Sequence, residues 1–322
     1  MHAQQIYATV SADFSQADEL IKQQLFSRVP LVENIGRYIT DSGGKRMRPL
    51  LVLLSANALG YKGSDHVKLA TIIEFLHTAT LLHDDVVDTS ELRRGRSTAN
   101  AKWGNAPSVL VGDFLYSRAF QMMVELGSMP IMDILSQATN VIAEGEVLQL
   151  MNVRNPDLTE AQYMDVIRSK TAMLFQAASH SAAVLAKASP EQEAGLRDFG
   201  LYLGMAFQLV DDVLDYRGNA EEMGKNVGDD LAEGKCTLPL IYTMQNGTSA
   251  QRDLVRQAIR QGGLDQLAPI LEAVSSSGAL EHTTQLAQNY VDQAEECLRA
   301  LPDSEFKAAL LGLAKLAVNR SK

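Results

Sequence analysis

Hydrophobic residues recur along most of this chain at the three- and four-residue spacing of an α-helix, and alternating strand-like runs are scarce. A clear example is Leu203, Phe207 and Val210. Two pairs of residues also predict capped helix starts: Thr159 with Gln162, and Ser189 with Gln192. The sequence therefore predicts an all-α protein built from long helices.

No composition shift, linker rich in serine or glycine, or repeat at a fixed period divides the 322 residues. We therefore expect a single domain over residues 1–322. The least helical stretch is Arg217 to Gly234, which is rich in glycine, aspartate and lysine. A loop of that length in a compact protein is often a functional lid.

Composition excludes several classes of protein. The formal net charge of -10 argues against a nonspecific grip on nucleic acid or anionic lipid as the main activity. Cys236 and Cys297 form no C-x-x-C pair, so they predict neither a disulfide framework nor a zinc site. The first residues lack the basic start and apolar run of a signal peptide. The most apolar stretch, Leu69 to Leu82, is shorter than the roughly 20 residues of a membrane span. We expect a cytoplasmic protein without a transmembrane helix.

An acidic cluster, Asp84-Asp85-Val86-Val87-Asp88, closes an apolar helical segment. Its spacing places the carboxylates of Asp84 and Asp88 on one face of a helix, one turn apart, where they repel each other. A shared hard cation explains this arrangement, because magnesium prefers oxygen ligands and usually keeps waters and substrate phosphates. A solvated helix end is the alternative for one such cluster alone.

A second copy, Asp211-Asp212-Val213-Leu214-Asp215, again ends an apolar helical run. Two such clusters facing each other across a helical bundle could hold several magnesium ions and clamp one diphosphate group. Neither cluster has the glycine and terminal glutamate of a calcium-binding hand, so a structural calcium module is disfavoured. Together the clusters predict a magnesium-dependent enzyme that acts on a diphosphate.

The positive charge that a diphosphate needs is also present. It occurs in Gly43-Gly44-Lys45-Arg46-Met47-Arg48-Pro49 and at Arg93, Arg94, Lys170, Lys225 and Lys235. Pro49 in the first turn of an apolar helix would place Lys45 and Arg48 at the positive helix N-terminus, where a diphosphate is favoured. No Ser or Thr follows Lys45 as in a Walker motif, and no G-x-G-x-x-G occurs, so nucleotide binding is not indicated.

Two uncharged polar residues share predicted helix faces with the aspartates. His77 lies about two turns before Asp84, and Gln208 lies three and four residues before Asp211 and Asp212. For His77, a hydrogen bond to substrate phosphate and a place as an ordinary core histidine remain open alternatives. For Gln208 we favour a place in the site.

In order and spacing these motifs resemble those of the trans-polyprenyl diphosphate synthases, and most of all the bacterial members that make octaprenyl chains. The resemblance covers nearly the whole chain, through Gly43-Gly44-Lys45-Arg46-Met47-Arg48-Pro49, Leu82-His83-Asp84-Asp85-Val86-Val87-Asp88, Arg93-Arg94-Gly95, Lys170-Thr171, Phe207-Gln208-Leu209-Val210-Asp211-Asp212, Gly224-Lys225-Asn226-Val227-Gly228-Asp229-Asp230 and Gly234-Lys235. It implies the isoprenoid synthase fold, an all-α, large single-domain helical bundle with a central active-site cavity.

The resemblance also implies three sets of site residues. The Mg²⁺ ligands are Asp84, Asp88 and Asp211, with Asp85, Asp212 and Asp215 nearby. The allylic diphosphate is bound by Arg93, Lys170, Thr171, Gln208, Lys225 and Lys235, of which Lys170, Thr171 and Gln208 are the expected catalytic residues. Isopentenyl diphosphate is bound by Lys45, Arg48, His77 and Arg94.

The implied reaction lengthens an allylic diphosphate, expected to be farnesyl diphosphate, with successive isopentenyl diphosphate units. The product is an all-trans polyprenyl diphosphate, expected to be octaprenyl, for quinone side chains. Magnesium and the cationic side chains help the diphosphate to leave, and the double bond of isopentenyl diphosphate attacks the remaining carbocation. Closure of the Arg217 to Gly234 loop, carrying Lys225 and Lys235, would exclude water.

Product length is expected to depend on the helix before the first aspartate cluster. Ala79 and Thr80, about a turn before Asp84, are small where short-chain members of the family carry bulky aromatics. They therefore predict a deep tunnel for the growing tail. Candidates for its floor are Phe120, Met122 and Met123, with ordinary core packing as their alternative role.

Other functions remain as alternatives. A noncatalytic regulatory subunit of a heteromeric prenyl synthase is disfavoured by the intact aspartate clusters. A terpene cyclase or head-to-head condensing enzyme would not need Lys45, Arg48 and Arg94. Within the family, the alternative is a shorter-chain farnesyl or geranylgeranyl synthase. The resemblance implies a homodimer, no nucleic-acid partner, and at most a transient membrane contact when the apolar product is released.

Overall fold

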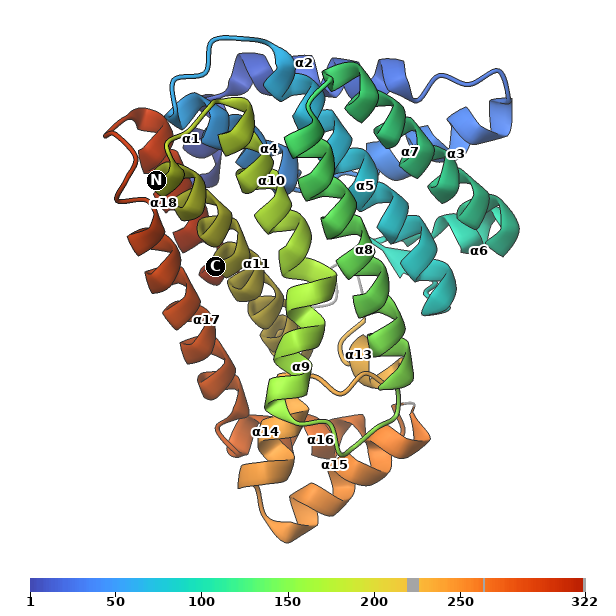
Figure 1. Cartoon of the computed structure of the whole chain (residues 1–322). Helices are drawn as coiled ribbons and strands as arrows, with labels where there is room; N and C mark the ends of the chain where they lie inside the picture. The colour runs from blue at the N-terminus through green and yellow to red at the C-terminus, as the bar shows by residue number, and fades with distance from the viewer. Residues whose placement is uncertain (219–225, 263, 321–322) are drawn as a thin grey trace. The chain divides into compact units, whose positions relative to one another are not determined.

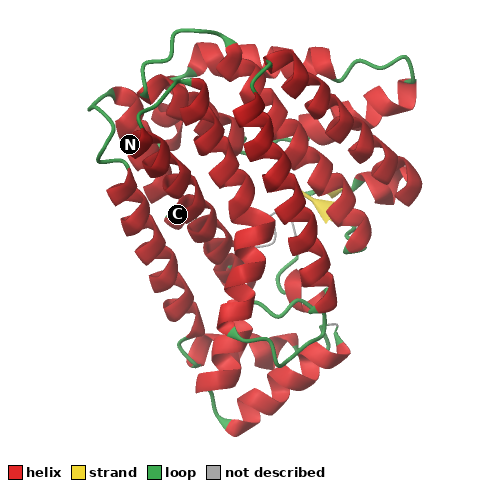
Figure 2. Ribbon diagram, viewed as in Figure 1, coloured by secondary structure: helices red, strands yellow, loops and turns green. Residues whose placement is uncertain are grey.

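The computed structural model describes residues 1–218, 226–262 and 264–320. Within them the chain is almost entirely helical, with one two-stranded antiparallel hairpin (Figure 1, Figure 2). This confirms the predicted all-α class. Among the described helices, none combines the length and apolar character needed to cross a membrane.

The elements follow each other without long irregular segments in the first two thirds of the chain. They are α1 (Ala3–Ala8), α2 (Ser11–Gln24), α3 (Pro30–Asp41), α4 (Met47–Ala58), α5 (Asp65–Val87), β1 (Leu92–Arg93), β2 (Arg96–Ser97), α6 (Ala99–Trp103), α7 (Asn105–Leu126), α8 (Met129–Met151), α9 (Glu160–Ile167), the π-helix η1 (Arg168–Ala172), α10 (Met173–Leu185) and α11 (Pro190–Arg217). The remaining helices are α13 (Asp229–Ala232), α14 (Leu238–Asn246), α15 (Ser249–Gln261), α16 (Leu267–Ser276), α17 (Ala279–Cys297) and α18 (Glu305–Val318).

Local sequence signals set several helix starts as predicted. Thr159 Oγ1 accepts a hydrogen bond from the Gln162 amide at 3.2 Å, and the Gln162 side chain accepts one from the Thr159 amide at 3.0 Å. Ser189 and Gln192 form the same reciprocal pair. These capping boxes satisfy amide groups that have no partner within the helix. Both predicted helix starts are therefore confirmed.

Packing divides the chain into two compact units. Unit 1 contains Met1–Gln137, Leu174–Gly200 and Cys297–Leu313, and unit 2 contains Ala138–Met173, Leu201–Glu296 and Ala314–Lys322. Helices α8 and α11 contribute residues to both units, so no linker separates them in the sequence. A single domain over residues 1–322 stays a prediction.

The core of unit 1 is built on α4 and α5. Five consecutive side chains of α4, Leu50 to Leu54, have no exposed surface, and most of α5 is buried as well. A helix that is apolar on every side is stable only when other helices surround it. The apolar stretch from Leu69 to Leu82 is therefore a core helix of unit 1, which agrees with the prediction that it does not span a membrane.

Helix α7 packs antiparallel against α5 within unit 1 (Figure 1). Near one end, Ser108 Oγ donates a hydrogen bond to the Leu82 carbonyl at 3.0 Å. Near the other, Lys68 Nζ pairs with Glu125 at 3.2 Å. The part of α5 that leads into the aspartates thus runs along α7 in the opposite direction.

Unit 2 has its own apolar core, to which α9, α11, α14, α15, α16 and α17 contribute. Its fully buried members include Met205, Leu209, Leu238, Leu240 and Ile259. Helices α14, α15 and α16 lie against one another in this unit, at the bottom of Figure 1. This core supports the C-terminal half of α11, which carries the second aspartate cluster.

The predicted irregular stretch from Arg217 to Gly234 differs in part from the structure. Arg217 is the last residue of α11, and Asp229–Ala232 forms the short helix α13. The expectation of an irregular loop was therefore wrong at these two places, because hydrophobic spacing neither fixes the last residue of a long helix nor reveals a helix as short as α13. Residues 219–225, including the expected phosphate ligand Lys225, lie outside the described residues.

Gly200→Ala is expected to destabilise the protein, because α11 approaches α10 closely at this residue. A Cβ atom here would collide with the Phe175 carbonyl and the Ser179 hydroxyl and would lie 2.9 Å from Gln176 Cα. We expect the free energy of unfolding, measured by urea denaturation, to fall by about 1–3 kcal/mol. Gly36→Ala is the matched control, since its closest contact would be a side-chain methyl group, Leu25 Cδ2 at 2.9 Å, rather than backbone. An equal loss in both variants would contradict the backbone-contact explanation.

Candidate active site

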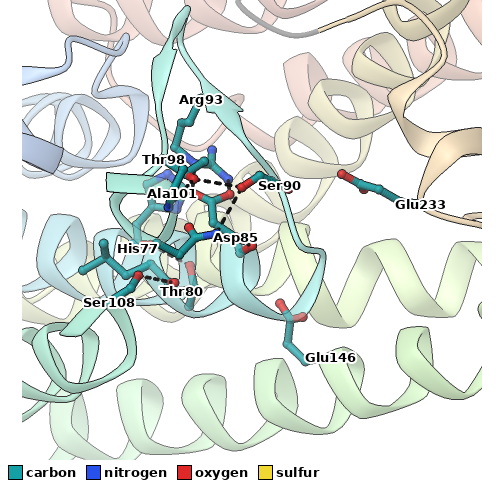
Figure 3. Close-up of polar contacts among 12 residues, drawn as sticks. His77, Thr80, Asp85, Ser90, Arg93, Thr98, Ala101, Ser108, Glu146 and Glu233 are labelled. Atoms are coloured by element: carbon teal, nitrogen blue, oxygen red, sulfur yellow. Dashed lines mark hydrogen bonds and ion pairs between the residues drawn. The ribbon is translucent and has the colours of Figure 1, made fainter. Parts of the chain in front are cut away.

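The first aspartate cluster lies at the end of α5, and its three carboxylates differ in burial. Asp84 and Asp88 are partly exposed, whereas Asp85 is only 2% exposed. Arg93 holds Asp85 with two parallel hydrogen bonds, from Nε to Oδ2 and from Nη2 to Oδ1, both 2.8 Å long. Figure 3 shows Arg93 directed at Asp85. The cluster therefore separates into one carboxylate bound within the protein and two at its surface.

The β1–β2 hairpin positions Arg93 through backbone contacts with the end of α5 (Figure 3). The Ser90 amide donates to the Asp85 carbonyl at 2.9 Å, and Thr98 Oγ1 donates to the Ser90 carbonyl at 2.8 Å. Arg94 has a left-handed backbone, with φ 52°, in the turn between the strands. As a result the neighbouring arginines contact different parts of unit 1.

Arg94 lies on the glycine pair that precedes α4. Its Nη1 donates to Ser42 Oγ at 3.2 Å and to the Gly43 carbonyl. Gly44 has a φ of +116°, and a Cβ there would lie 2.6 Å from Arg94 Cζ. Only glycine combines this backbone with the close approach. The Gly43-Gly44 pair thus allows the Arg94 guanidinium to pack directly against the backbone before α4.

Arg48 and His77 contact each other as two of the residues expected to bind isopentenyl diphosphate. Arg48 is the second residue of α4, its Nη1 lies 3.2 Å from His77 Nε2, and its guanidinium lies 4.3 Å from the centre of the Phe175 ring. Burial, followed by the charges of Arg48, Arg94 and Arg93, holds the pKa of His77 well below its usual range. Because guanidinium groups only donate, Nε2 accepts and the neutral imidazole carries its proton on Nδ1.

Glu74 is a carboxylate in the same region that the sequence analysis missed. It lies one turn before His77 on α5 and is 6% exposed. Burial raises the pKa of Glu74, and the nearby charges of Arg46, Arg48 and Arg94 oppose that rise. The expected isopentenyl diphosphate site is therefore a cationic cluster arranged around a buried acid. Lys45 adjoins it, with its backbone carbonyl accepting from the Tyr7 hydroxyl.

The second aspartate cluster, near the end of α11 in unit 2, is also divided. Asp211 has 37% of its side chain exposed, while Asp212 and Asp215 are fully buried. The Tyr163 hydroxyl donates to Asp212 Oδ2, and Gln208 Nε2 donates to Asp212 Oδ1 at 3.0 Å. Burial and the nearby charge of Asp230 raise the pKa of Asp212, and these two hydrogen bonds oppose the rise.

The structure brings four predicted residues of the allylic diphosphate site into one pocket of unit 2. They are Lys170, Thr171, Gln208 and Lys235. Thr171 Oγ1 donates to Gln208 Oε1 at 3.1 Å, which links this pair to the buried Asp212. Further lining residues that the sequence analysis missed are Gln149, Tyr163, Asp230 and Thr237. Tyr163 lies seven residues before Lys170, a helical spacing that could have indicated it.

A π-turn and a glycine position Lys170. Residues Arg168–Ala172 form η1 between α9 and α10, and single π-turns within helices often occur at functional sites. A Cβ at Gly145 of α8 would lie 2.8 Å from Ser169 Cβ and 3.1 Å from the Lys170 amide nitrogen. Because Gly145 lacks that atom, α8 comes close enough for Lys170 Nζ to bond Gln149 and to pair with Glu146 at 3.3 Å.

Two predicted residues of this site are not among the described residues of unit 2. Arg93 belongs to unit 1, where it holds Asp85, and Lys225 lies outside the described residues. Lys235 Nζ pairs with Glu233 at 2.9 Å at the end of the turn after α13. Arg320, from beyond α18, pairs with Asp211 at 2.6 Å. It is 109 positions away in sequence, and no local pattern predicted the contact.

The donor groups fit a magnesium ion that is bound partly by substrate. Within the described part of the chain, no three His, Cys, Asp or Glu residues converge to form a closed metal cage. Instead, Asp84 and Asp88 present two partly exposed carboxylates one turn apart in unit 1. Asp211 presents a single partly exposed carboxylate in unit 2. Magnesium takes few protein carboxylates and completes its shell with water and phosphate oxygens. That the two clusters face each other stays a prediction.

The expected chain-length residues are mostly core residues of unit 1. Ala79, Met122 and Met123 have at most 1% exposed surface. Thr80 is half-buried and donates from Oγ1 to the His77 carbonyl at 2.6 Å. Phe120 is half-buried, with its ring centre 5.6 Å from that of Tyr116. Their role in product length stays a prediction.

His77→Gln is expected to reduce the loss of stability in weak acid. His77 stays neutral in the folded chain, with its pKa held below the ordinary value of 6.5. Below that pH the unfolded chain binds a proton that the folded chain does not. The free energy of unfolding therefore decreases as pH falls below the pKa of this histidine in the unfolded chain, by up to about 1.4 kcal/mol per pH unit.

Glutamine binds no proton and can still accept from Arg48. Urea unfolding of the wild type and variant at about pH 7.5 and about pH 5.5 should show a smaller loss on acidification in His77→Gln. His2→Gln, at an exposed position, is the control for removing a histidine. An unchanged loss in His77→Gln would contradict an imidazole that stays neutral in the folded chain.

Comparison with known proteins identifies relatives over the full length of the chain. Residues 29–274 match the polyprenyl synthetase family. The chain is 54% identical to octaprenyl diphosphate synthase of Escherichia coli (strain K12), with complete coverage of both chains. It is 48% identical to all-trans-nonaprenyl-diphosphate synthase (geranyl-diphosphate specific) of Rhodobacter capsulatus over 98% of each.

A solved structure agrees with these relatives. It is polyprenyl synthase from Caulobacter crescentus CB15 complexed with calcium and isoprenyl diphosphate, with a TM-score of 0.97 and 43% identity. The similarity covers 100% of this chain and 98% of that one. The chain belongs to the polyprenyl synthetase family.

Proposed function

We propose that this chain is a trans-prenyltransferase that extends an allylic diphosphate with successive isopentenyl diphosphate units to a medium- or long-chain all-trans polyprenyl diphosphate. Identity of 54% over the full length of an octaprenyl diphosphate synthase carries the proposal. The pocket that gathers Lys170, Thr171, Gln208 and Lys235 beside Asp212 supports it. The chain has carboxylates that could hold the metal and cationic side chains that could bind the diphosphate.

The allylic diphosphate would be bound by the cationic residues of unit 2. Lys170 and Lys235 line the pocket and supply positive charge for oxygens that become more negative as the carbon–oxygen bond breaks. The hydrogen-bonded pair Thr171 and Gln208 is fixed by Asp212, so its orientation is set before substrate binds. Magnesium, when held by Asp84, Asp88 and Asp211, would neutralise the leaving diphosphate as a Lewis acid.

Isopentenyl diphosphate would be bound by Lys45, Arg48, His77 and Arg94 in unit 1. The contacts of Arg94 with Ser42 and Gly43, and of Arg48 with His77 and Phe175, fix these guanidinium groups before binding. Preorganised donors lose less conformational entropy when they bind an anion.

The finer points of this proposal follow the resemblance. We propose Mg²⁺ as the metal, farnesyl diphosphate as the starter, octaprenyl diphosphate as the product for quinone side chains, and a homodimer in the cytoplasm. The relative complexed with calcium and isoprenyl diphosphate supports a divalent metal site. The octaprenyl and nonaprenyl names of two relatives support a long product.

The decisive experiment is incubation of purified protein with farnesyl diphosphate, labelled isopentenyl diphosphate and Mg²⁺, followed by mass spectrometry of the products. We expect a ladder of prenyl diphosphates that ends at octaprenyl and that disappears with a metal chelator. The Asp84→Asn, Asp88→Asn double variant controls for a contaminating synthase. A ladder that ends early would indicate a shorter-chain synthase. No product with any allylic starter would favour the noncatalytic subunit.

Thr80→Phe is expected to shorten the product. Thr80 lies four residues before Asp84 on α5 and is only half-buried, so a larger side chain can be accommodated more readily than at the fully buried Ala79. A phenyl ring there should block the growing tail, and the ladder measured by mass spectrometry should end several units earlier. Thr80→Ser keeps the hydrogen bond to His77 and should leave the ladder unchanged. A full-length product from a folded, active Thr80→Phe variant would show that this position does not control product length.

A further inference from the structure

An arginine that follows α18 in the sequence forms an ion pair with the partly exposed aspartate of the second cluster. Arg320 Nη1 donates to Asp211 Oδ1 at 2.6 Å, and Nη2 donates to the Phe207 carbonyl at 2.6 Å. Its guanidinium lies 3.8 Å from the centre of the Phe207 ring. Only 7% of the Arg320 side chain is exposed. Two charge-assisted hydrogen bonds and an aromatic contact make this a well-defined site for one side chain.

The aspartate that Arg320 holds is also the one best placed for a cation. Asp212 and Asp215 are fully buried, and Asp212 is already bound by Tyr163 and Gln208. Asp211 has 37% of its side chain exposed, so a hydrated ion can reach it. The guanidinium and a divalent cation would therefore require the same carboxylate.

Two positive charges at one carboxylate disfavour each other. A metal ion at Asp211 must either take Oδ1 from Arg320 or bind Oδ2 with the guanidinium still close, and in both cases binding is weakened. Without metal, Arg320 offsets the repulsion among the three carboxylates of the cluster. We propose that Arg320 is a positioning residue that competes with the divalent cation for Asp211 and couples the end of α18 to metal loading.

This inference rests on the proposed role of Asp211 as a metal ligand. By linkage, the coupling acts in both directions. Metal binding weakens the ion pair between Arg320 and Asp211, and removal of Arg320 strengthens metal binding. A purely structural role, in which Arg320 only anchors the chain after α18, predicts unchanged metal affinity. The two roles therefore differ in a quantity that does not depend on catalysis.

The test is titration of the full chain with Mn²⁺, without substrates, by isothermal calorimetry. Arg320→Gln is expected to bind Mn²⁺ more tightly than the wild type, by about fivefold or more. Arg320→Lys keeps the positive charge but cannot donate two parallel hydrogen bonds. Its affinity for Mn²⁺ should lie between that of the wild type and that of Arg320→Gln. Arg197→Gln is the matched control, because Arg197 pairs with Asp198 at 3.0 Å on the surface of unit 1.

A second variant covers a failure of Arg320→Gln to fold. Phe207→Leu removes the aromatic contact and leaves all charges in place, so it should tighten Mn²⁺ binding by a smaller factor. Hydrogen exchange adds the reciprocal measurement: the Asn319 and Arg320 amides should exchange faster when Mn²⁺ is bound to the wild type. Unchanged or weaker Mn²⁺ binding in folded Arg320→Gln would overturn the inference.

Asp211→Asn separates this inference from the proposed function. If Asp211→Asn weakens Mn²⁺ binding while Arg320→Gln leaves it unchanged, Asp211 is a metal ligand and only the competition by Arg320 is refuted. If Asp211→Asn has no effect on Mn²⁺ binding, the proposed metal role of Asp211 fails, and the inference fails with it.

Discussion

Repulsion among carboxylates that share a single helical turn is the constraint around which both aspartate clusters are built. Each cluster places three acids within five residues at the end of an apolar helix, where their charges cannot all be buried without partners. The structure resolves this in the same way twice. The second aspartate is buried and bound by protein donors, Arg93 for Asp85 and Tyr163 with Gln208 for Asp212. The first aspartate, Asp84 or Asp211, stays partly exposed. The repeated motif thus has two kinds of acid, one that is buried and held by protein donors and one that stays partly exposed.

The cationic cluster of unit 1 shows the same principle with opposite signs. Arg46, Arg48 and Arg94 would repel one another, and the buried Glu74 lies among them as a counter-charge. Backbone geometry fixes the arrangement as well, since Arg94 rests on the Gly43-Gly44 pair. In the proposed isopentenyl diphosphate site, guanidinium groups already fixed in this way would bind a diphosphate with little reorganisation. If these arginines bind a diphosphate, Glu74 is the counter-charge that holds them together before the anion arrives.

Local rules predicted the features that depend on neighbouring residues. The capping boxes at Thr159 and Ser189 and the end of α5 at the first aspartate cluster follow from patterns within a few positions, and the structure has them. The features that were missed depend on residues distant in sequence or on a change of helix type. Arg320 reaches Asp211 across 109 positions, and the π-turn at Lys170 leaves the regular helical periodicity. Neither has a signature in hydrophobic spacing, which reports only which face of a helix is buried.

Product length is expected to depend on apolar side chains of α5 and α7 in unit 1 rather than on the charged groups. Because α5 and α7 are antiparallel, with Ser108 beside Leu82 and Lys68 beside Glu125, the buried Met122 lies near the level of Ala70 and Thr71 on α5. That level is about 20 Å from Asp84 at the rise of an α-helix. The apolar side chains between these levels, such as Ala79, are the ones whose sizes we expect to set how much tail fits. Motifs of charged residues therefore predict the reaction, whereas the predicted length of the product rests on the packing of two apolar helices. Exchanging one small residue for a large one there would change the available space without changing the chemistry.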